Sequence, residues 1–196
     1  MDLDDICNID EFGNEFEITT QSYSPSFKID GVKVYPLRRF KDDGGSFLEL
    51  ARLNGGELLL GGSRIDVYDG GSPVPFIPQQ INVSHVMPGA IKAWHLHFKQ
   101  EDVWFVPPQD RLVVGLLDLR KNSPTKFCTM RLVLGDGDGQ ALLIPRGVAH
   151  GCSNPYDRPM QLMYIVNQQF NADAPDEHRL DYAAYVGRSF WEIQPG

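Results

Sequence analysis

The chain has 196 residues, with 18 basic and 26 acidic side chains and a formal net charge of −8. This length and a hydrophobic content of 42% are typical of a globular domain with a sizeable core, and they exclude a disordered or collagen-like chain. The negative net charge excludes the broad positive surface that nucleic acids and anionic membranes require, so we expect no nucleic-acid and no membrane partner.

The first segment, residues 1–26, is acidic, contains no lysine or arginine and shows no firm strand pattern. We therefore expect an acidic N-terminal arm, followed by one domain over residues 27–196. The arm lacks the basic and apolar regions of a secretory signal, and no later stretch has the apolar length of a membrane span. Cys7, Cys128 and Cys152 are widely spaced and form no disulfide framework, which favours the cytoplasm.

Short apolar runs separated by glycine and proline predict β-strands along most of the chain. Helical periodicity is nearly absent, and the one short helix that we expect lies near the C-terminus, over Asp176–Tyr185. Many short strands are typical of a closed or two-sheet antiparallel architecture. The predicted strands cover residues 32–39, 47–53, 57–60, 80–86, 90–98, 103–106, 112–119, 127–134, 140–144 and 160–166.

Within Gly89–Glu101, polar and apolar side chains alternate. Successive side chains of a strand point to opposite faces, so Trp94 shares one face with Leu96, and His95 shares the other with His97. Glu101 joins the histidines if the strand is unbroken. The simplest interpretation is a polar face turned to water. In a small barrel or jelly roll, however, such a face can line a ligand cavity.

A second segment, Gly139–Asn154, contributes another histidine, His150. Together the two segments resemble the paired motifs of the cupin superfamily. The resemblance implies an all-β fold, the cupin jelly roll or double-stranded β-helix, with antiparallel strands. The matching positions are Gly89, His95, His97 and Glu101 in the first motif, and Gly139, Pro145, Gly147, His150 and Asn154 in the second.

Phrases on either side of these motifs narrow the resemblance. Their order is similar to that in the dTDP-4-dehydrorhamnose 3,5-epimerase family. The phrases are a stretch that ends at Phe47-Leu-Glu49, then Gln80-Ile-Asn82, Asp118-Leu-Arg120, Ser123-Pro124-Thr125 and Tyr164. The likeness extends over about Gly31–Tyr182. It implies a homodimeric enzyme that acts on a thymidine-diphosphate 4-keto-6-deoxyhexose, with no cofactor.

The resemblance also implies roles for individual residues. A C4 carbonyl acidifies the protons at C3 and C5, and a neutral imidazole is suited to remove one at working pH. His95 matches the family's base and Tyr164 its proton donor on the other side of the sugar. Asp181 is the carboxylate that we expect near His95, because Ala183 occupies the aligned position. The expected substrate-binding residues are Gln80, Asn82, Lys92, His150 and Glu49.

Two other classes of function stay open. His95, His97, Glu101 and His150 form a set that suits a divalent transition metal, as in a metal-dependent dioxygenase or isomerase. A protein that only binds a nucleotide sugar, or a structural homologue, is the other alternative. It is favoured by Gly44 and Ala183, which stand where the family has an arginine and an aspartate, and by the missing lysine beside the developing enolate.

Overall fold

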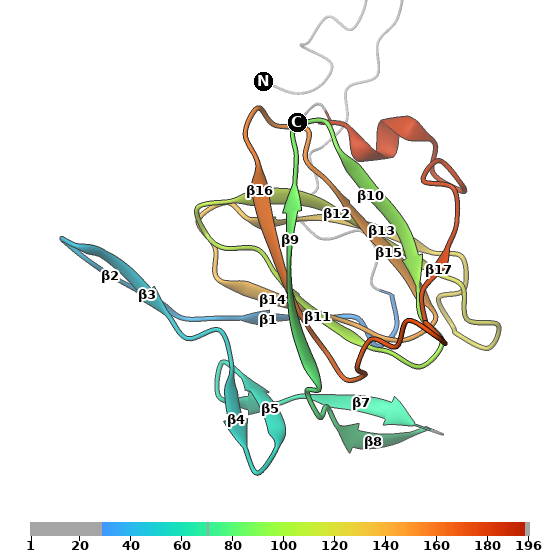
Figure 1. Ribbon diagram of the computed structural model, residues 1–196, viewed down its shortest axis with the longest axis horizontal. Coiled ribbons are helices and arrows are strands. Elements are labelled where there is room, and N and C mark those ends of the chain that lie inside the picture. Colours follow the sequence, from blue (N-terminus) through green and yellow to red (C-terminus); the bar gives the residue numbers. More distant parts are fainter. Residues whose placement is uncertain (1–28, 70, 195–196) are drawn as a thin grey trace, which may run out of the picture.

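The computed structural model describes residues 29–69 and 71–194, so the predicted arm over residues 1–26 lies outside the described part. Figure 1 shows a body of β-strands from which several hairpins extend. None of the helical structure in the described residues has the length and apolar character needed to cross a membrane.

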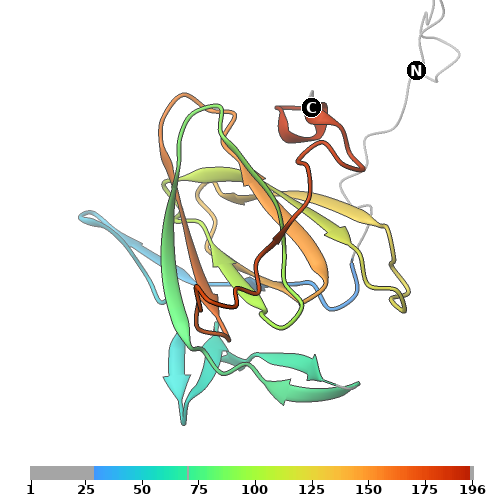
Figure 2. The same ribbon diagram turned by 45° about the vertical axis from the view of Figure 1, so that its right-hand side comes forward.

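Two five-stranded antiparallel sheets form the body (Figures 1 and 2). This arrangement confirms the predicted all-β cupin jelly roll. The first sheet has the order β1 (Lys33–Pro36), β14 (Gln140–Ile144), β11 (Asp102–Phe105), β16 (Met160–Val166) and β9 (Gln80–Val86). The second has the order β13 (Thr129–Gly135), β12 (Arg111–Asp118), β15 (Val148–Ser153), β10 (Ile91–Leu96) and β17 (His178–Arg179).

The main core lies between the two sheets and follows from strand alternation. Along β12, Leu112, Val114 and Leu116 point inward and pack in one cluster with Leu142 and Ile144 of β14. Intervening side chains of β12 point to the outer face of the sheet, yet the strand is buried from residue 112 to residue 118. A strand that is apolar on both faces needs a cover on its outer side, and the C-terminal segment supplies it.

The predicted helix over Asp176–Tyr185 is wrong. Residues 178–179 form β17, which pairs with β10, and the helical structure in this segment is a single 3₁₀ turn, Arg188–Trp191. Pairing with a free strand edge satisfies the backbone here, and it overrides a weak local helix preference. Trp191 is buried behind β12, where a Cβ at Gly115 would lie 2.6 Å from its ring. Glycine at position 115 therefore permits the close approach of Trp191.

Three small sheets lie between β1 and β9 in the chain. They are formed by β2 (Arg39–Asp42) with β3 (Gly45–Leu48), by β4 (Arg52–Asn54), β5 (Glu57–Leu60) and β6 (Ser63–Arg64), and by β7 (Asp66–Asp69) with β8 (Ser72–Pro75). The β2–β3 hairpin projects from the body (Figure 1). Leu58, Leu60 and Phe76 form a second buried cluster with Val103 and Phe105 on the outer face of the first sheet. The predicted strand over residues 47–53 is thus divided between β3 and β4.

Candidate active site

A cavity of about 570 Å³ lies between the two sheets and is lined by polar and aromatic side chains. The first sheet contributes one wall, the second sheet contributes the facing wall, and the C-terminal segment contributes part of the rim. The lining residues are Gln80, Asn82, Ser84, Asp102, Trp104, Leu162 and Tyr164 from the first sheet, Lys92, His95, His150, Cys152 and Arg179 from the second, and His97, Gln100, Phe170 and Glu177 from segments outside the two sheets.

A β-bulge in β10 decides which of its side chains enter the cavity. Lys92 pairs with Cys152 and His95 pairs with His150, so β10 has one more residue between the two pairs than β15 has. Strict alternation places residues 92 and 95 on opposite faces, whereas the extra residue turns both into the cavity. Trp94, between them, packs on the outer side against Trp191.

His95 is held by a carboxylate. Its Nδ1 lies 2.5 Å from Oε1 of Glu177, which precedes β17. With the Nδ1 hydrogen donated to this carboxylate, the lone pair is on Nε2, the nitrogen that remains for chemistry in the cavity. The hydrogen bond with His95 lowers the pKa of Glu177 despite its partial burial. Arg179 adds positive charge, 3.4 Å from the same Glu177 oxygen. An imidazole with a fixed tautomer and an anionic partner has the arrangement that a general base requires.

The structure does not place Asp181 in this role. β17 pairs antiparallel with β10, so that Arg179 lies opposite His95, and Leu180 exchanges backbone hydrogen bonds with Trp94. Position 181 is therefore beyond His95, toward the bulge. The carboxylate of Asp181 instead accepts a hydrogen bond from the backbone N–H of Ala183 at 2.8 Å. Glu177, on the other side of Arg179, supplies the carboxylate that sequence reasoning assigned to Asp181.

Tyr164 stands on the wall that faces the histidines. It lies between Trp104 of β11 and Asn82 of β9 in the register of the first sheet, and all three point into the cavity. Beside them, Gln80 donates its amide hydrogen to Asn82 at 2.7 Å and accepts the backbone N–H of Phe170 at 2.9 Å. These bonds fix the amide groups of one wall and tie it to the rim segment that carries Phe170.

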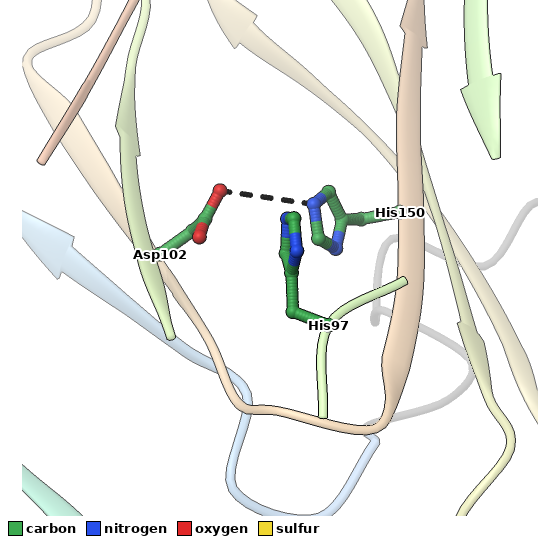
Figure 3. Close-up of side chains that lie close together, drawn as sticks. All are labelled: His97, Asp102 and His150. Carbon is green, nitrogen blue, oxygen red and sulfur yellow. Dashed lines mark ion pairs between the residues drawn. The ribbon is translucent and has the colours of Figure 1, made fainter. Parts of the chain in front are cut away.

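A group of three buried side chains lines the same cavity and is drawn in Figure 3; one of them, His150, stacks on His95 with the ring centroids 6.1 Å apart. His97, Asp102 and His150 are exposed by 5%, 2% and 3%, and Nε2 of His150 lies 3.7 Å from Oδ2 of Asp102. Burial lowers the pKa of His150 to about 4, although Asp102 acts in the opposite direction. His150 is therefore a neutral imidazole at neutral pH. Burial also raises the pKa of the nearby Cys152 thiol to about 12, which makes it unreactive.

Besides Asp181, two of the predicted site residues lie outside this cavity. Glu101 precedes β11 and faces the opposite side of the sheet from Asp102, so it lines a separate cavity of about 460 Å³. Alternation at the start of β11 thus removes Glu101 from the predicted set of four metal ligands, whose three histidines do line the main cavity. Glu49 forms a 2.8 Å ion pair with Arg52, away from the residues that line the main cavity.

Sequence reasoning missed several residues that line the cavity. Glu177 and Arg179 belong to a polar phrase whose pattern fits a helix, so the pattern did not indicate a strand that pairs beside His95. Asp102 was not predicted, because its neighbour Glu101 occupies the glutamate position of the first cupin motif. Phe170 follows β16 in an irregular segment, where no periodic signal exists to assign it.

Comparison with known proteins places the chain in a family. The sequence model of the protein family described as dTDP-4-dehydrorhamnose 3,5-epimerase matches residues 26–185. The chain is 38% identical over 154 residues to the spore coat polysaccharide biosynthesis protein SpsL of Bacillus subtilis, covering 79% of this chain and 90% of that protein. It is 32% identical over 117 residues to a probable low-salt glycan biosynthesis epimerase of Haloferax volcanii, covering 60% and 75%.

Solved structures agree with this placement. A dTDP sugar isomerase from Desulfovibrio desulfuricans G20 shares the fold with a TM-score of 0.66 at 23% identity, covering 85% of this chain and 94% of that one. A dTDP-4-dehydrorhamnose 3,5-epimerase from Bacillus anthracis, with TDP and PPi bound, has a TM-score of 0.58 at 25% identity, covering 78% and 83%. The chain belongs to the dTDP-4-dehydrorhamnose 3,5-epimerase family.

Proposed function

We propose that this protein is a nucleotide-sugar epimerase that inverts a dTDP-4-keto-6-deoxyhexose at C3, C5 or both. The observation that carries the proposal is the His95–Glu177 pair, with Nδ1 and Oε1 2.5 Å apart, in a cavity whose facing wall presents Tyr164. Family membership supports the same substrate class, and the B. anthracis relative holds TDP.

Each step of the reaction follows from the chemistry of these groups. The C4 carbonyl of the sugar acidifies the adjacent C–H bond, and Nε2 of His95 removes that proton to give an imidazolium and an enolate. Glu177 stabilises the imidazolium through the Nδ1 hydrogen. The phenol of Tyr164 then returns a proton to the same carbon from the opposite face. Solvent re-protonates the phenolate and takes the proton from His95. No electron is transferred, so the reaction needs no redox cofactor.

The rim of the cavity has groups that suit the nucleotide. Lys92 and Arg179 provide positive charge for a diphosphate, and Arg179 keeps 62% of its side chain exposed. Phe170 is 67% exposed and presents an aromatic ring on which a base can stack. Gln80 and Asn82 offer amide groups to the sugar hydroxyls. A cytoplasmic location, where nucleotide sugars are made, is part of the proposal.

Deuterium exchange tests the proposed reaction directly. The protein and dTDP-4-keto-6-deoxyglucose are incubated in D₂O, and NMR follows deuterium incorporation at C3 and C5. We expect exchange with the wild-type protein and a loss of at least about 1,000-fold in the rate with His95→Asn, since the base is removed. His85→Asn, an exposed histidine on the outer face of β9, is the matched control. Exchange that is no faster than in the His95→Asn sample would defeat the proposal.

We also propose that the protein is a homodimer. β9 is an edge strand of the first sheet, and Ile81 and Val83 on its outer face are 65% and 57% exposed. Such an edge is normally covered, because a free strand with apolar side chains promotes uncontrolled pairing. A second copy covers it in a closed assembly. Sedimentation equilibrium should give a dimer for the wild type and a monomer for Ile81→Lys combined with Val83→Glu; a wild-type monomer contradicts the proposal.

A further inference from the structure

The proposed proton transfers leave three buried polar side chains of the cavity without a role. His97 follows β10, Asp102 begins β11 and His150 lies in β15, so three separate segments bring them together. Figure 3 shows both rings and the carboxylate directed toward a common space. A buried carboxylate and two buried imidazoles destabilise a fold unless other groups compensate them, so their partners define what the cluster can hold.

The contacts of His97 fix its tautomer. Its Nδ1 contacts the backbone carbonyl oxygen of Asp176, which can only accept, so the ring hydrogen is on Nδ1. Nε2 therefore carries a lone pair. The side-chain amide of Gln100 lies 3.3 Å from this Nε2 and donates to it, which agrees with the assignment. Nε2 of His97 lies within 4.8 Å of the ligand atoms of Asp102 and His150, and an ion that binds it takes the lone pair from the amide of Gln100.

His150 is held in the same way. Its Nδ1 donates to the carbonyl oxygen of Val148 at 3.0 Å, which leaves a lone pair on Nε2. That lone pair faces Oδ2 of Asp102 at 3.7 Å, a separation beyond hydrogen-bond distance. Two electron-pair donors that face each other in this way repel, unless a positive centre lies between them.

Asp102 completes the arrangement. Trp104 donates its indole N–H to Oδ2 at 2.9 Å, and Gln100 donates to Oδ1 at 2.8 Å. Each carboxylate oxygen keeps a further lone pair, so these bonds orient the group without saturating it. Metal-binding histidines characteristically donate Nδ1–H to a backbone carbonyl or a carboxylate, and metal-binding carboxylates are themselves hydrogen-bonded. The two histidines and Asp102 have partners of this kind.

We propose that His97, Asp102 and His150 bind one divalent first-row transition metal ion, such as Zn²⁺, Mn²⁺ or Fe²⁺. One ligand atom from each residue lies within 4.8 Å of the other two, and two imidazoles with one carboxylate suit these ions. Two ligand atoms that each lie about 2.1 Å from one ion are at most about 4.2 Å apart, so the ligand atoms must move closer together when the ion binds. The site differs from the predicted set, because Asp102 replaces Glu101 and His95 is engaged by Glu177.

The coordination positions that the protein leaves open face the cavity, because all three ligands line it. An ion there can bind an oxygen of the sugar and act as a Lewis acid. This role rests on the proposed function, whereas the binding of the ion does not. The test is arranged so that the two can fail separately.

The experiment uses the full chain, dialysed against a chelator and titrated with Co²⁺ while the visible absorption is recorded. We expect one equivalent to bind, with d–d bands that Zn²⁺ abolishes by competition. Asp102→Asn keeps the size of the side chain but removes its charge, and His97→Asn removes a ligand; each should weaken binding at least 100-fold. The matched control is His178→Asn, because His178 forms a second histidine–aspartate pair, 3.6 Å from Asp176, at the surface.

Circular dichroism and thermal melting establish that each variant folds. Wild-type protein that shows no Co²⁺ bands up to millimolar concentration overturns the site, as does equal binding in the wild type, Asp102→Asn and His97→Asn. Deuterium exchange into the sugar is measured on the same samples with and without metal. Metal binding without exchange overturns the proposed function and leaves the site intact, and exchange without metal binding does the reverse.

Discussion

The replacement Glu177→Gln isolates the charge of the carboxylate beside His95. Glutamine keeps an oxygen that accepts the Nδ1 hydrogen, so the ring orientation survives and the negative charge is lost. Two unit charges about 4 Å apart attract by about 4 kcal/mol at an effective dielectric constant of 20. Because 37% of the Glu177 side chain and 21% of the His95 side chain are exposed, water screens part of this attraction. We take about 2–3 kcal/mol as the loss when His95 becomes an imidazolium, equivalent to a roughly 30- to 150-fold decrease in kcat.

The assay is the initial rate of deuterium incorporation at saturating sugar nucleotide, with Glu192→Gln as a control at an exposed carboxylate. Stability provides a second readout. The pKa of Glu177 is lowered in the folded protein, so its contribution is present above the ordinary carboxyl pKa and is lost as the pH falls through the lowered value. A variant with unchanged kcat would refute the role of Glu177.

Three further predictions concern the facing wall, the rim and the sheet end. Tyr164→Phe should keep exchange at the carbon that His95 deprotonates but reduce inverted product at least about 10-fold, which NMR of the products measures; equal inversion contradicts the role of Tyr164. Phe170→Ala should weaken dTDP binding about 5- to 100-fold in calorimetry, in contrast to the exposed control Phe127→Ala, and unchanged affinity removes Phe170 from the nucleotide site. Asp118→Asn should cost about 3 kcal/mol in urea unfolding, because Asp118 is fully buried and hydrogen-bonded to Arg120; a loss below 1 kcal/mol would contradict this.

Asp118 also gives a prediction with a definite sign in pH. Burial alone raises its pKa, but hydrogen bonds from Arg120, Ser123 and Thr125 outweigh burial and lower the pKa to about 2. The wild type therefore keeps this stabilisation above an ordinary aspartate pKa and loses it as the pH falls toward 2. The difference in unfolding free energy between the wild type and Asp118→Asn should shrink over that range.

The sequence predicts the jelly roll well because strands have a period of two and turns have characteristic residues. Alternation alone, however, cannot show where a strand contains an extra residue. The bulge in β10 has no signature in Ala93 or Trp94, yet it decides that Lys92 and His95 enter the same cavity. Similarly, alternation across residues 101–104 assigns Asp102 inward only once the start of β11 is known. The spacing of the cupin motif instead predicted the neighbouring Glu101 as the residue of the site.

The C-terminal segment shows why the remaining part of the site escaped prediction. Its local pattern fits a helix, but its conformation is set by contacts far away in the chain. The carboxylate of Asp176 accepts backbone N–H groups from Phe98, Lys99 and Gln100, and Trp191 is anchored behind Gly115. Glu177 lies between these two anchors. The partner of the base is therefore placed by packing on the outer face of the second sheet, and a change that loosens Trp191 is expected to reduce catalysis from outside the cavity.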